Sequence, residues 1–155
     1  MTGLAKWLYL VALIVWVGAV VFFSFVAAPA IFGVLPKAEA SRTVGVIFPA
    51  YYRLGYVCGA VLVVTSLVLR GHAVARLWWG VSAMVAAAML AATLYAGTVV
   101  LPAATALRPQ IVQGTPPQPV REEFDRLHRL AVNLNVIVMA GGALMSVITA
   151  AALRP

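Results

Sequence analysis

Four long apolar runs divide the chain, and polar residues gather in the segments between them. The runs cover about residues 7–28, 50–69, 77–101 and 130–153, and none contains an acidic residue. At about 1.5 Å per residue, each run is long enough to cross the roughly 30 Å hydrocarbon core of a bilayer. None alternates with the period of two that a membrane β-strand requires. The pattern therefore predicts four transmembrane helices.

The connections between the runs predict an all-α, four-transmembrane-helix bundle that forms a single domain over residues 1–155. An even number of crossings places both termini on one face, together with the short connection 70–76. The segments 29–49 and 102–129 lie on the other face, and 102–129 is expected to be a surface segment. Its PPQP stretch at 116–119 cannot continue a helix. The apolar spacing that follows predicts one helix from about Arg121 into the membrane.

Composition supports a membrane location and excludes several classes of function. The chain is 64% hydrophobic and 10% charged, whereas a soluble domain is nearer half apolar and a quarter charged. Membrane lipids are therefore the first expected partner. The net charge of +7 comes from bases scattered singly, so it does not indicate nucleic-acid binding. Cys58 is the only cysteine, which rules out a disulfide within the chain.

The basic residues give conflicting indications of orientation. The face with the termini carries four bases and no acids, and the other face carries seven bases with all four acids. The base count alone favours the second face as cytoplasmic. The short 70–76 loop and the lone terminal bases favour the first. We expect a multi-pass protein of the cell membrane, of the bacterial inner-membrane type, with cytoplasmic termini, because bases within structured polar motifs can be there for function.

Polarity is concentrated in residues 121–135, which hold three of the four acids and one of the two histidines. At 100° per residue, His128, Asn135 and Ser146 fall on or near one helical face and predict a polar stripe running into the membrane. Polar groups at that depth need partners. Interhelical hydrogen bonding explains Asn135 and Ser146 equally well. The candidate partners are Tyr52, Arg53, Tyr56 and Ser66 on the second helix and Thr93, Tyr95 and Thr98 on the third.

No cofactor can be named from the sequence, and an enzyme is not favoured. His72 and His128 lie on opposite faces and cannot clamp one haem. There is no paired-cysteine motif, phosphate loop or dinucleotide fingerprint. Soft ligands for copper(I) are available, but scattered methionines are more typical of packing. They are Met84, Met89, Met139 and Met145, with Cys58.

Stripes of small residues follow the second, third and fourth runs, and in lipid such stripes mark close helix contacts. They predict packing within the bundle and self-association into a homo-oligomer. The stripes consist of Gly55 and Gly59, then Gly80, Ala83, Ala87 and Ala91, then Gly141 and Gly142.

Three stretches together carry a family resemblance. They are WVGAVVFFSFVAAPAIFGVL at 16–35, VGVIFPAYYRLGYVCG at 44–59 and FDRLHRLAVNLN at 124–135. Over about residues 7–150 the chain resembles the transmembrane-protein-205-like family, also catalogued as domain of unknown function 4149. The resemblance implies a four-helix membrane protein, loosely associated with resistance to platinum drugs and distantly related to copper-resistance proteins. The motif positions are Pro29, Phe32, Phe48, Pro49, Tyr51, Tyr52, Phe124, His128 and Asn133 or Asn135.

A second, fainter resemblance comes from the W-x-G-x-x-x-F pattern of the first run, which is similar to that of the bacterial four-helix protoporphyrinogen oxidases. Those proteins are expected to have a histidine in the first helix. This chain has none there, which argues against a haem role.

We interpret the polar cluster as a mouth, formed by residues 29–53 and 102–135, that binds or transports a small solute or a metal species. His128 would be the ligand or proton acceptor, Arg53 the anion clamp, and Tyr51 and Tyr52 the walls. One alternative is a membrane redox protein holding haem or quinone near His128, and another is a non-catalytic oligomeric scaffold. The candidate ligand-binding residues are His128, Arg53, Tyr51, Tyr52, Asn135, Tyr95, Phe124 and Tyr56.

Overall fold

The structure, a computed structural model, describes residues 2–72, 75–112 and 116–152. This part of the chain is helical almost throughout and contains no strand. The elements in order are α1 (Thr2–Phe22), η1 (Phe23–Ala27), α2 (Ala28–Val34), α3 (Lys37–His72), α4 (Arg76–Tyr95), η2 (Ala96–Val100), α5 (Leu101–Val112) and α6 (Gln118–Ala152).

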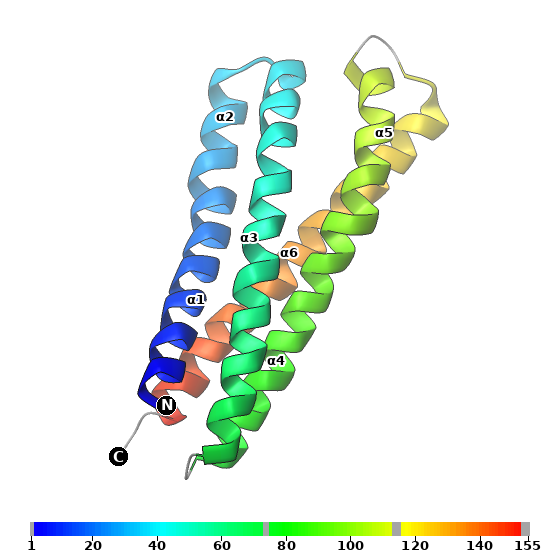
Figure 1. The fold of residues 1–155 in the computed structure, drawn as a ribbon. Helices are drawn as coiled ribbons and strands as arrows, with labels where there is room; N and C mark the ends of the chain where they lie inside the picture. The colour runs from blue at the N-terminus through cyan, green and yellow to red at the C-terminus, as the bar shows by residue number, and fades with distance from the viewer. Residues whose placement is uncertain (1, 73–74, 113–115, 153–155) are drawn as a thin grey trace.

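The elements join into four continuous rods, and each is long and apolar enough to cross a membrane. The rods are α1–η1–α2, α3, α4–η2–α5 and α6 (Figure 1). The predicted all-α bundle of four spanning helices is confirmed, and the chain is a multi-pass membrane protein. As expected from an even number of crossings, α1 begins and α6 ends at the same end of the bundle (Figure 1). We call the opposite end the loop end.

The helices extend further toward the loop end than the apolar runs alone indicate. Helix α3 begins at Lys37 rather than near residue 50, and α5 continues to Val112 rather than stopping near residue 101. Helix α6 begins at Gln118, within PPQP, because proline is tolerated in a first turn. Hydropathy marks the part of a helix that lies in lipid, whereas the polar turns beyond it stay helical without an apolar signal. The segments 29–49 and 102–129 are therefore mostly helix.

The rods pack closely at the terminal end and diverge at the loop end. Helix α1 contacts α3 and α6, and α4 contacts α3 and α6, which closes a four-helix ring. Beyond that ring, α2 approaches only α3 apart from its own rod, and α5 lies mainly along α6. Figure 1 shows the α2–α3 and α5–α6 pairs separating at the end away from the termini. The extra polar turns therefore form two arms rather than one tight bundle.

Each of two rods contains one π-helical turn immediately before a proline. The amide of Ala28 bonds the carbonyl of Phe23, and the amide of Leu101 bonds that of Ala96, both five residues back. Proline has no amide hydrogen, and its ring collides with the carbonyl four residues earlier. A wider turn relieves that collision and lets each helix continue through Pro29 or Pro102. Single π turns occur frequently at functional sites.

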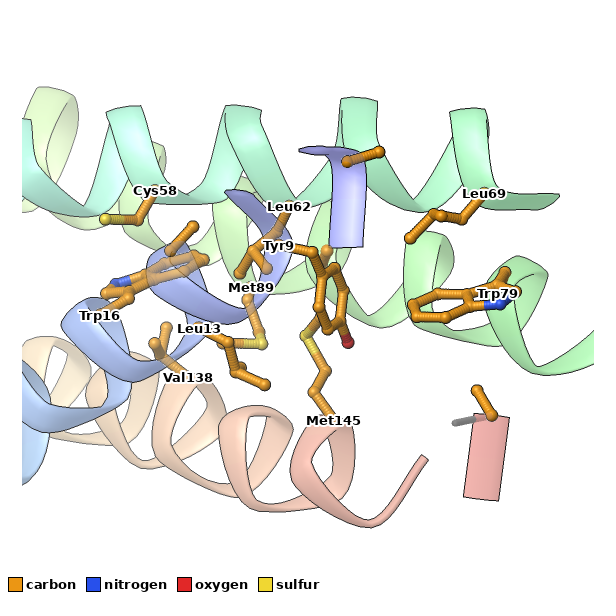
Figure 2. Close-up of a cluster of buried hydrophobic side chains, with 14 of the residues drawn as sticks. Tyr9, Leu13, Trp16, Cys58, Leu62, Leu69, Trp79, Met89, Val138 and Met145 are labelled. Carbon is orange, nitrogen blue, oxygen red and sulfur yellow. The ribbon is translucent and has the colours of Figure 1, made fainter. Parts of the chain in front are cut away.

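The core lies in the packed half of the bundle and is built around aromatic residues of α1. Figure 2 shows Tyr9 and Trp16 among side chains from the other three rods, including Cys58, Leu62 and Met145. Glycines admit these large rings. An added Cβ at Gly59 would lie 3.0 Å from the Trp16 ring, and one at Gly55 would lie 3.1 Å from its indole nitrogen. The small residues of α3 therefore serve packing within this chain.

Candidate functional site

Three helices are joined by side-chain hydrogen bonds at the last level before the arms diverge. The Tyr51 hydroxyl donates to Asn135 Oδ1 at 2.6 Å, and Asn135 Nδ2 donates to Ser24 Oγ at 2.9 Å. Tyr51 belongs to α3, Asn135 to α6, and Ser24 to the π turn η1. We call these three residues the polar triad. All three side chains are partly buried, and the triad lies at the level where the α2–α3 and α5–α6 pairs begin to separate.

Aromatic rings surround the triad on the α1 and α3 side. The Phe23 ring centre lies 5.2 Å from that of Tyr51, and Phe48 stacks on Tyr52 at 5.8 Å. Tyr51 and Tyr52 meet edge to face at 5.5 Å. These rings fix the side chain of Tyr51, so its hydroxyl is held toward Asn135. Tyr51 and Tyr52, which the sequence analysis places as walls of the mouth, therefore lie together at the level of the triad.

A small cavity lies against the triad, between α3, α4 and α6. It contains about 260 Å³ of empty space, part of it open to the surroundings. Its enclosed part has room for about one water molecule. A single water could bridge groups here, but a quinone or haem ring has no space inside the packed bundle. The lining residues are Trp16, Tyr51, Tyr52, Ala92, Thr93, Ala96, Ala131, Leu134, Asn135 and Val138.

Tyr56 packs closely against η2. Its hydroxyl lies against the backbone of Gly97 in the π turn η2, where an added Cβ would overlap it. The Cβ of Tyr52 lies 3.0 Å from the same position. Gly97 is therefore required for the close approach of α3 and η2. The contact joins one π turn to the helix that carries the triad tyrosine.

The structure does not bring every predicted site residue to the triad. His128, Arg53 and Tyr95 are exposed, and Phe124 is half-buried. The Arg53 Nε donates to the carbonyl of Pro49 on its own helix at 3.2 Å. Arg53 follows the buried Tyr52 by one residue, about 100° around the helix, and so lies outside the packed face.

The register of α6 explains why His128 is exposed. Positions 135, 142 and 149 recur every seven residues and face α1: Asn135 bonds Ser24, Gly142 lies against Val17, and Thr149 bonds Tyr9. His128 continues this series by one more step of seven, about 10 Å further along the helix. There it would face α2, but α2 and α6 no longer approach each other. His128 therefore occupies an α1-facing position in the part of the bundle that has opened.

The predicted polar stripe of α6 is inward-facing at only one of its three positions. Asn135 is inside, whereas His128 and Ser146 are exposed. The Ser146 hydroxyl donates to the Gly142 carbonyl at 3.0 Å, which satisfies it within its own helix. Ser146 is displaced by one position from Met145, which is fully buried. A shift of about 100° is enough to move a side chain from the core to the lipid face.

A second polar cluster, which sequence reasoning missed as a unit, lies deep in the packed half. The Tyr9 hydroxyl is 2.9 Å from Ser82 Oγ and 2.8 Å from Thr149 Oγ1, and Ser66 Oγ is 3.3 Å from Ser82 Oγ. We call these four residues the hydroxyl chain. They come from all four rods and are buried. The only sequence signal is four hydroxyl residues at similar depth, and Tyr9 reads equally well as an interfacial anchor.

The donors of the hydroxyl chain can be assigned by counting hydrogens. Thr149 donates to the Met145 carbonyl at 2.6 Å, so it must accept from Tyr9. Tyr9 has then used its only hydrogen and accepts from Ser82, which in turn accepts from Ser66. Every hydrogen in this chain has an acceptor. A fully satisfied network of this kind specifies how buried helices fit together.

Arg108 is a second residue that the sequence analysis did not single out. It lies on α5 and reaches across to α3, where its guanidinium occupies the place of a Cβ at Gly45. Its Nε is buried without a hydrogen-bond partner. From the sequence it is one base among several in a polar segment. Its contact with Gly45, which joins the two arms, is seen only in the three-dimensional structure.

The groups around the triad are hydroxyls and an amide, and no cluster of metal-ligating side chains is found in the described part of the chain. Across the described residues, no three His, Cys, Asp or Glu side chains come together. Met89 and Met145 are fully buried in the hydrophobic core with Cys58, where thioethers fill space. The triad itself offers hydroxyl and amide groups, which donate and accept hydrogen bonds without changing charge near neutral pH.

Comparison with known proteins identifies a family but no characterised relative. No curated protein and no solved structure matches the chain. The sequence profile of one family matches residues 11–113, which run from the middle of α1 to the end of α5 and include Ser24, Tyr51 and Arg108. That match extends over more than half of the chain. The protein therefore belongs to the family described as Domain of unknown function (DUF4149).

Proposed function

We propose that this membrane protein binds a small polar solute in the space between its diverging arms, with the polar triad as the floor. The observation that carries the proposal is the hydrogen-bonded Tyr51–Asn135–Ser24 triad, which lies where the rods separate. Polar groups at such depth are costly in a membrane protein and commonly mark binding sites or pathways. The two π turns at neighbouring levels add support, because such turns often accompany function.

The mouth includes residues that extend beyond the triad. His128 lies one heptad further along α6, and Phe48 lies nearer the loop end of α3 than Tyr51 does, stacked on Tyr52. In this proposal His128 remains the ligand or proton acceptor. Arg53 lies on an exposed face, so its role as an anion clamp depends on a rotation of its side chain. Tyr95 and Phe124 have supporting positions around the rim.

Transport is the less direct form of the proposal. Below the triad, the core is closed by fully buried side chains such as Leu62, Met89 and Met145. A solute that reaches the triad can cross the membrane only if the packed half rearranges or if a second copy provides a path. Binding therefore needs no change in the bundle, and passage does.

A metal species, haem or quinone fits the residues less well than a polar solute. The other histidine, His72, lies at the opposite end of the bundle, so His128 has no second imidazole beside it, and the cavity holds about one water. Metal resistance would therefore need donors from a second copy or a metal already carried by a solute. An absorption band in the visible range from purified protein would favour the redox alternative.

Self-association and the finer family likeness complete the proposal. Exposed small residues such as Ala87 and Ala88 on α4 leave a surface against which a second copy could pack, while Gly55 and Gly59 serve internal contacts. The motifs at 16–35, 44–59 and 124–135 support a place in the transmembrane-protein-205-like family. A bacterial inner-membrane location is consistent with these features.

Two asparagines on α6 provide a matched test of the proposal. Asn135 belongs to the triad, whereas Asn133 is exposed two residues away. Thermal unfolding in detergent would be followed with a defined panel of amino acids, polyols and small amides. We expect at least one compound to raise the melting temperature of the wild type and of Asn133→Leu, because ligand binding to the folded state stabilises it. The same compound should not raise that of Asn135→Leu.

The proposal fails if no panel member shifts the wild type, or if Asn135→Leu responds as strongly as Asn133→Leu. Tyr51→Phe provides a second variant, since it keeps the ring and removes only the hydroxyl that donates to Asn135. An unchanged response in Tyr51→Phe and a lost response in Asn135→Leu would restrict the site to the amide and Ser24.

A further inference from the structure

Arg108 carries the one buried side-chain nitrogen or oxygen, among the described residues, that lacks a hydrogen-bond partner. That atom is its Nε. Most buried polar atoms in folded proteins are paired, and an exception calls for an explanation. The rest of the guanidinium lies against the backbone of Gly45, where an added Cβ would overlap a terminal nitrogen. The side chain thus extends from one arm to the other and ends without an acceptor for its Nε.

No carboxylate in the described structure balances the charge of Arg108. The one ion pair found there joins Arg126 to Glu123 at 2.7 Å, on the surface of α6. Glu39, Glu122 and Asp125 are exposed. Arginine keeps its proton in proteins, so the buried part of the guanidinium is stabilised by a nearby anion. Within the described part of the chain, no acidic side chain provides that anion.

The α3 surface beneath the guanidinium is formed by a glycine and shaped by a proline. Pro49 has no amide hydrogen, so the Gly45 carbonyl, four residues earlier, lacks its usual helical donor. Gly45 has no side chain and therefore lets the planar guanidinium lie close to the backbone. A planar fork held in this way is suited to two parallel hydrogen bonds to an oxyanion.

The location also suits an anion at the membrane surface. Arg108 lies seven residues past the end of the third apolar run, about 10 Å along the helix, which corresponds to the level of lipid head groups. This end of the molecule carries seven bases against four acids. Its electrostatic potential therefore favours anions over cations.

We propose that Arg108, held against Gly45, is the anchor of an oxyanion-binding site between α3 and α5 that takes a phosphate group. The phosphate can belong to a lipid head group or be free in solution, since both present the same oxygens to the guanidinium. The site lies further toward the loop end than the polar triad and does not depend on solute binding there. Its occupant would tie the two arms together through Arg108.

Two measurements distinguish the sources of the phosphate. In the first, inorganic phosphate is titrated into protein in a non-ionic detergent at constant ionic strength, and binding is followed by calorimetry. In the second, protein in nanodiscs of phosphatidylcholine, with or without phosphatidylglycerol, is analysed by native mass spectrometry for retained lipid. Wild type is compared with Arg108→Gln and Gly45→Ala, and with Arg42→Gln as an exposed arginine on α3, three residues from Gly45.

In whichever of the two measurements detects binding, we expect Arg108→Gln to weaken it at least about tenfold, because a charged hydrogen-bond donor is lost. Gly45→Ala should also weaken binding, since the added methyl displaces the guanidinium without removing its charge. Arg42→Gln should change affinity by less than about twofold. Phosphate binding in detergent supports a free ion, and retention of phosphatidylglycerol supports a lipid head group.

The inference is overturned if neither measurement detects binding to the wild type, or if Arg108→Gln binds as well as Arg42→Gln does. Arg108→Lys guards against misfolding, because it keeps the charge and loses the planar fork; it should bind more weakly than wild type and more tightly than Arg108→Gln. Asn135→Leu should leave phosphate binding intact, so this site and the proposed solute site can fail separately.

Discussion

At the scale of single residues, hydroxyl and amide groups decide how this apolar bundle is held together. Tyr9 links α1 to α4 and α6 through one hydroxyl, and Asn135 links α6 to η1 and α3 through one amide. In lipid, apolar side chains gain little by leaving their surroundings, so such bonds and close packing provide the specificity. The two clusters lie in different halves of the molecule. One is sealed in the core, and the other forms the floor of the open end.

Replacing Tyr9 with phenylalanine tests the hydroxyl chain. The variant keeps the ring but leaves the Ser82 hydrogen without its acceptor and Thr149 without its donor. We expect a loss of about 1–2 kcal/mol in the free energy of unfolding, measured by denaturant titration in micelles. Tyr95→Phe is the matched control, because Tyr95 is 48% exposed and makes no side-chain hydrogen bond within the described residues. Equal stability of the two variants would contradict the assignment.

At the scale of helices, the prolines and π turns show how polar arms can continue from membrane spans. Pro29 and Pro102 each follow a widened turn, so two rods pass the proline without breaking. Each wide turn also advances the register by about one residue, which re-aims the side chains beyond it. Arg108 lies beyond η2 on its own rod, and His128 lies at the height of α2, which follows η1 on the first rod. The arms are therefore set by irregular turns at the edge of the packed half.

Gly97 tests the contact between η2 and α3. A methyl group there would overlap the Tyr56 hydroxyl and lie 3.0 Å from the Tyr52 Cβ, so the Tyr56 side chain must move and α3 must shift slightly away. We expect Gly97→Ala to cost about 1–3 kcal/mol in the free energy of unfolding, as overpacking usually does. Gly18→Ala serves as the control because nothing lies within 4 Å of its added Cβ. It should be neutral or slightly stabilising, and a similar loss in both variants would rule out the contact.

The spans and the need of Asn135 for a polar partner could be predicted from the sequence, whereas the identity of its partners and the shape of the site could not. Apolar runs without acids identify four crossings, and an asparagine in the fourth run needs a polar partner. Its partners in the structure, Tyr51 and Ser24, are not among the candidate partners that the sequence indicates. Hydropathy does not report where helices diverge. For that reason the sequence places His128 on the same side of α6 as Asn135, but it does not show that α2 and α6 have separated at that level. Arg108 and Tyr9 depend on neighbours far apart in sequence, so no local pattern reveals them.

At the scale of the whole molecule, the four rods form a packed half and an opened half that hold different kinds of residues. The packed half holds the hydroxyl chain and the aromatic core, and the opened half holds Arg108, His128 and the triad as its floor. The polar turns of the arms lie beyond the predicted lipid-buried runs. Water can hydrate them there, so close packing is no longer required. The contacts that stabilise the bundle and the residues proposed to bind ligands thus lie at opposite ends of the same four rods.

The orientation of the molecule remains a prediction at this scale. We expect the termini on the cytoplasmic side and the arms on the opposite side. Reporter fusions after the final residue, with alkaline phosphatase and a fluorescent protein compared, would measure it in a bacterial inner membrane. A fluorescent and phosphatase-inactive fusion agrees with cytoplasmic termini. The reverse result would place the arms and Arg108 in the cytoplasm, as the base count alone favours.

The most direct test of the account is disulfide trapping between the first rod and α6, in a Cys58→Ala background. A Cβ added at Gly142 lies 3.7 Å from the Cβ of Val17, which is within the Cβ–Cβ range of a disulfide. The series that pairs 142 with 17 and 135 with 24 continues, seven residues further along each rod, to positions 128 and 31. The π turn shifts the register by about one residue, so position 32 is tested as well. Under mild oxidation we predict rapid crosslinking of Val17→Cys with Gly142→Cys. His128→Cys should crosslink with neither Ile31→Cys nor Phe32→Cys, and equal crosslinking in both halves would contradict the open mouth.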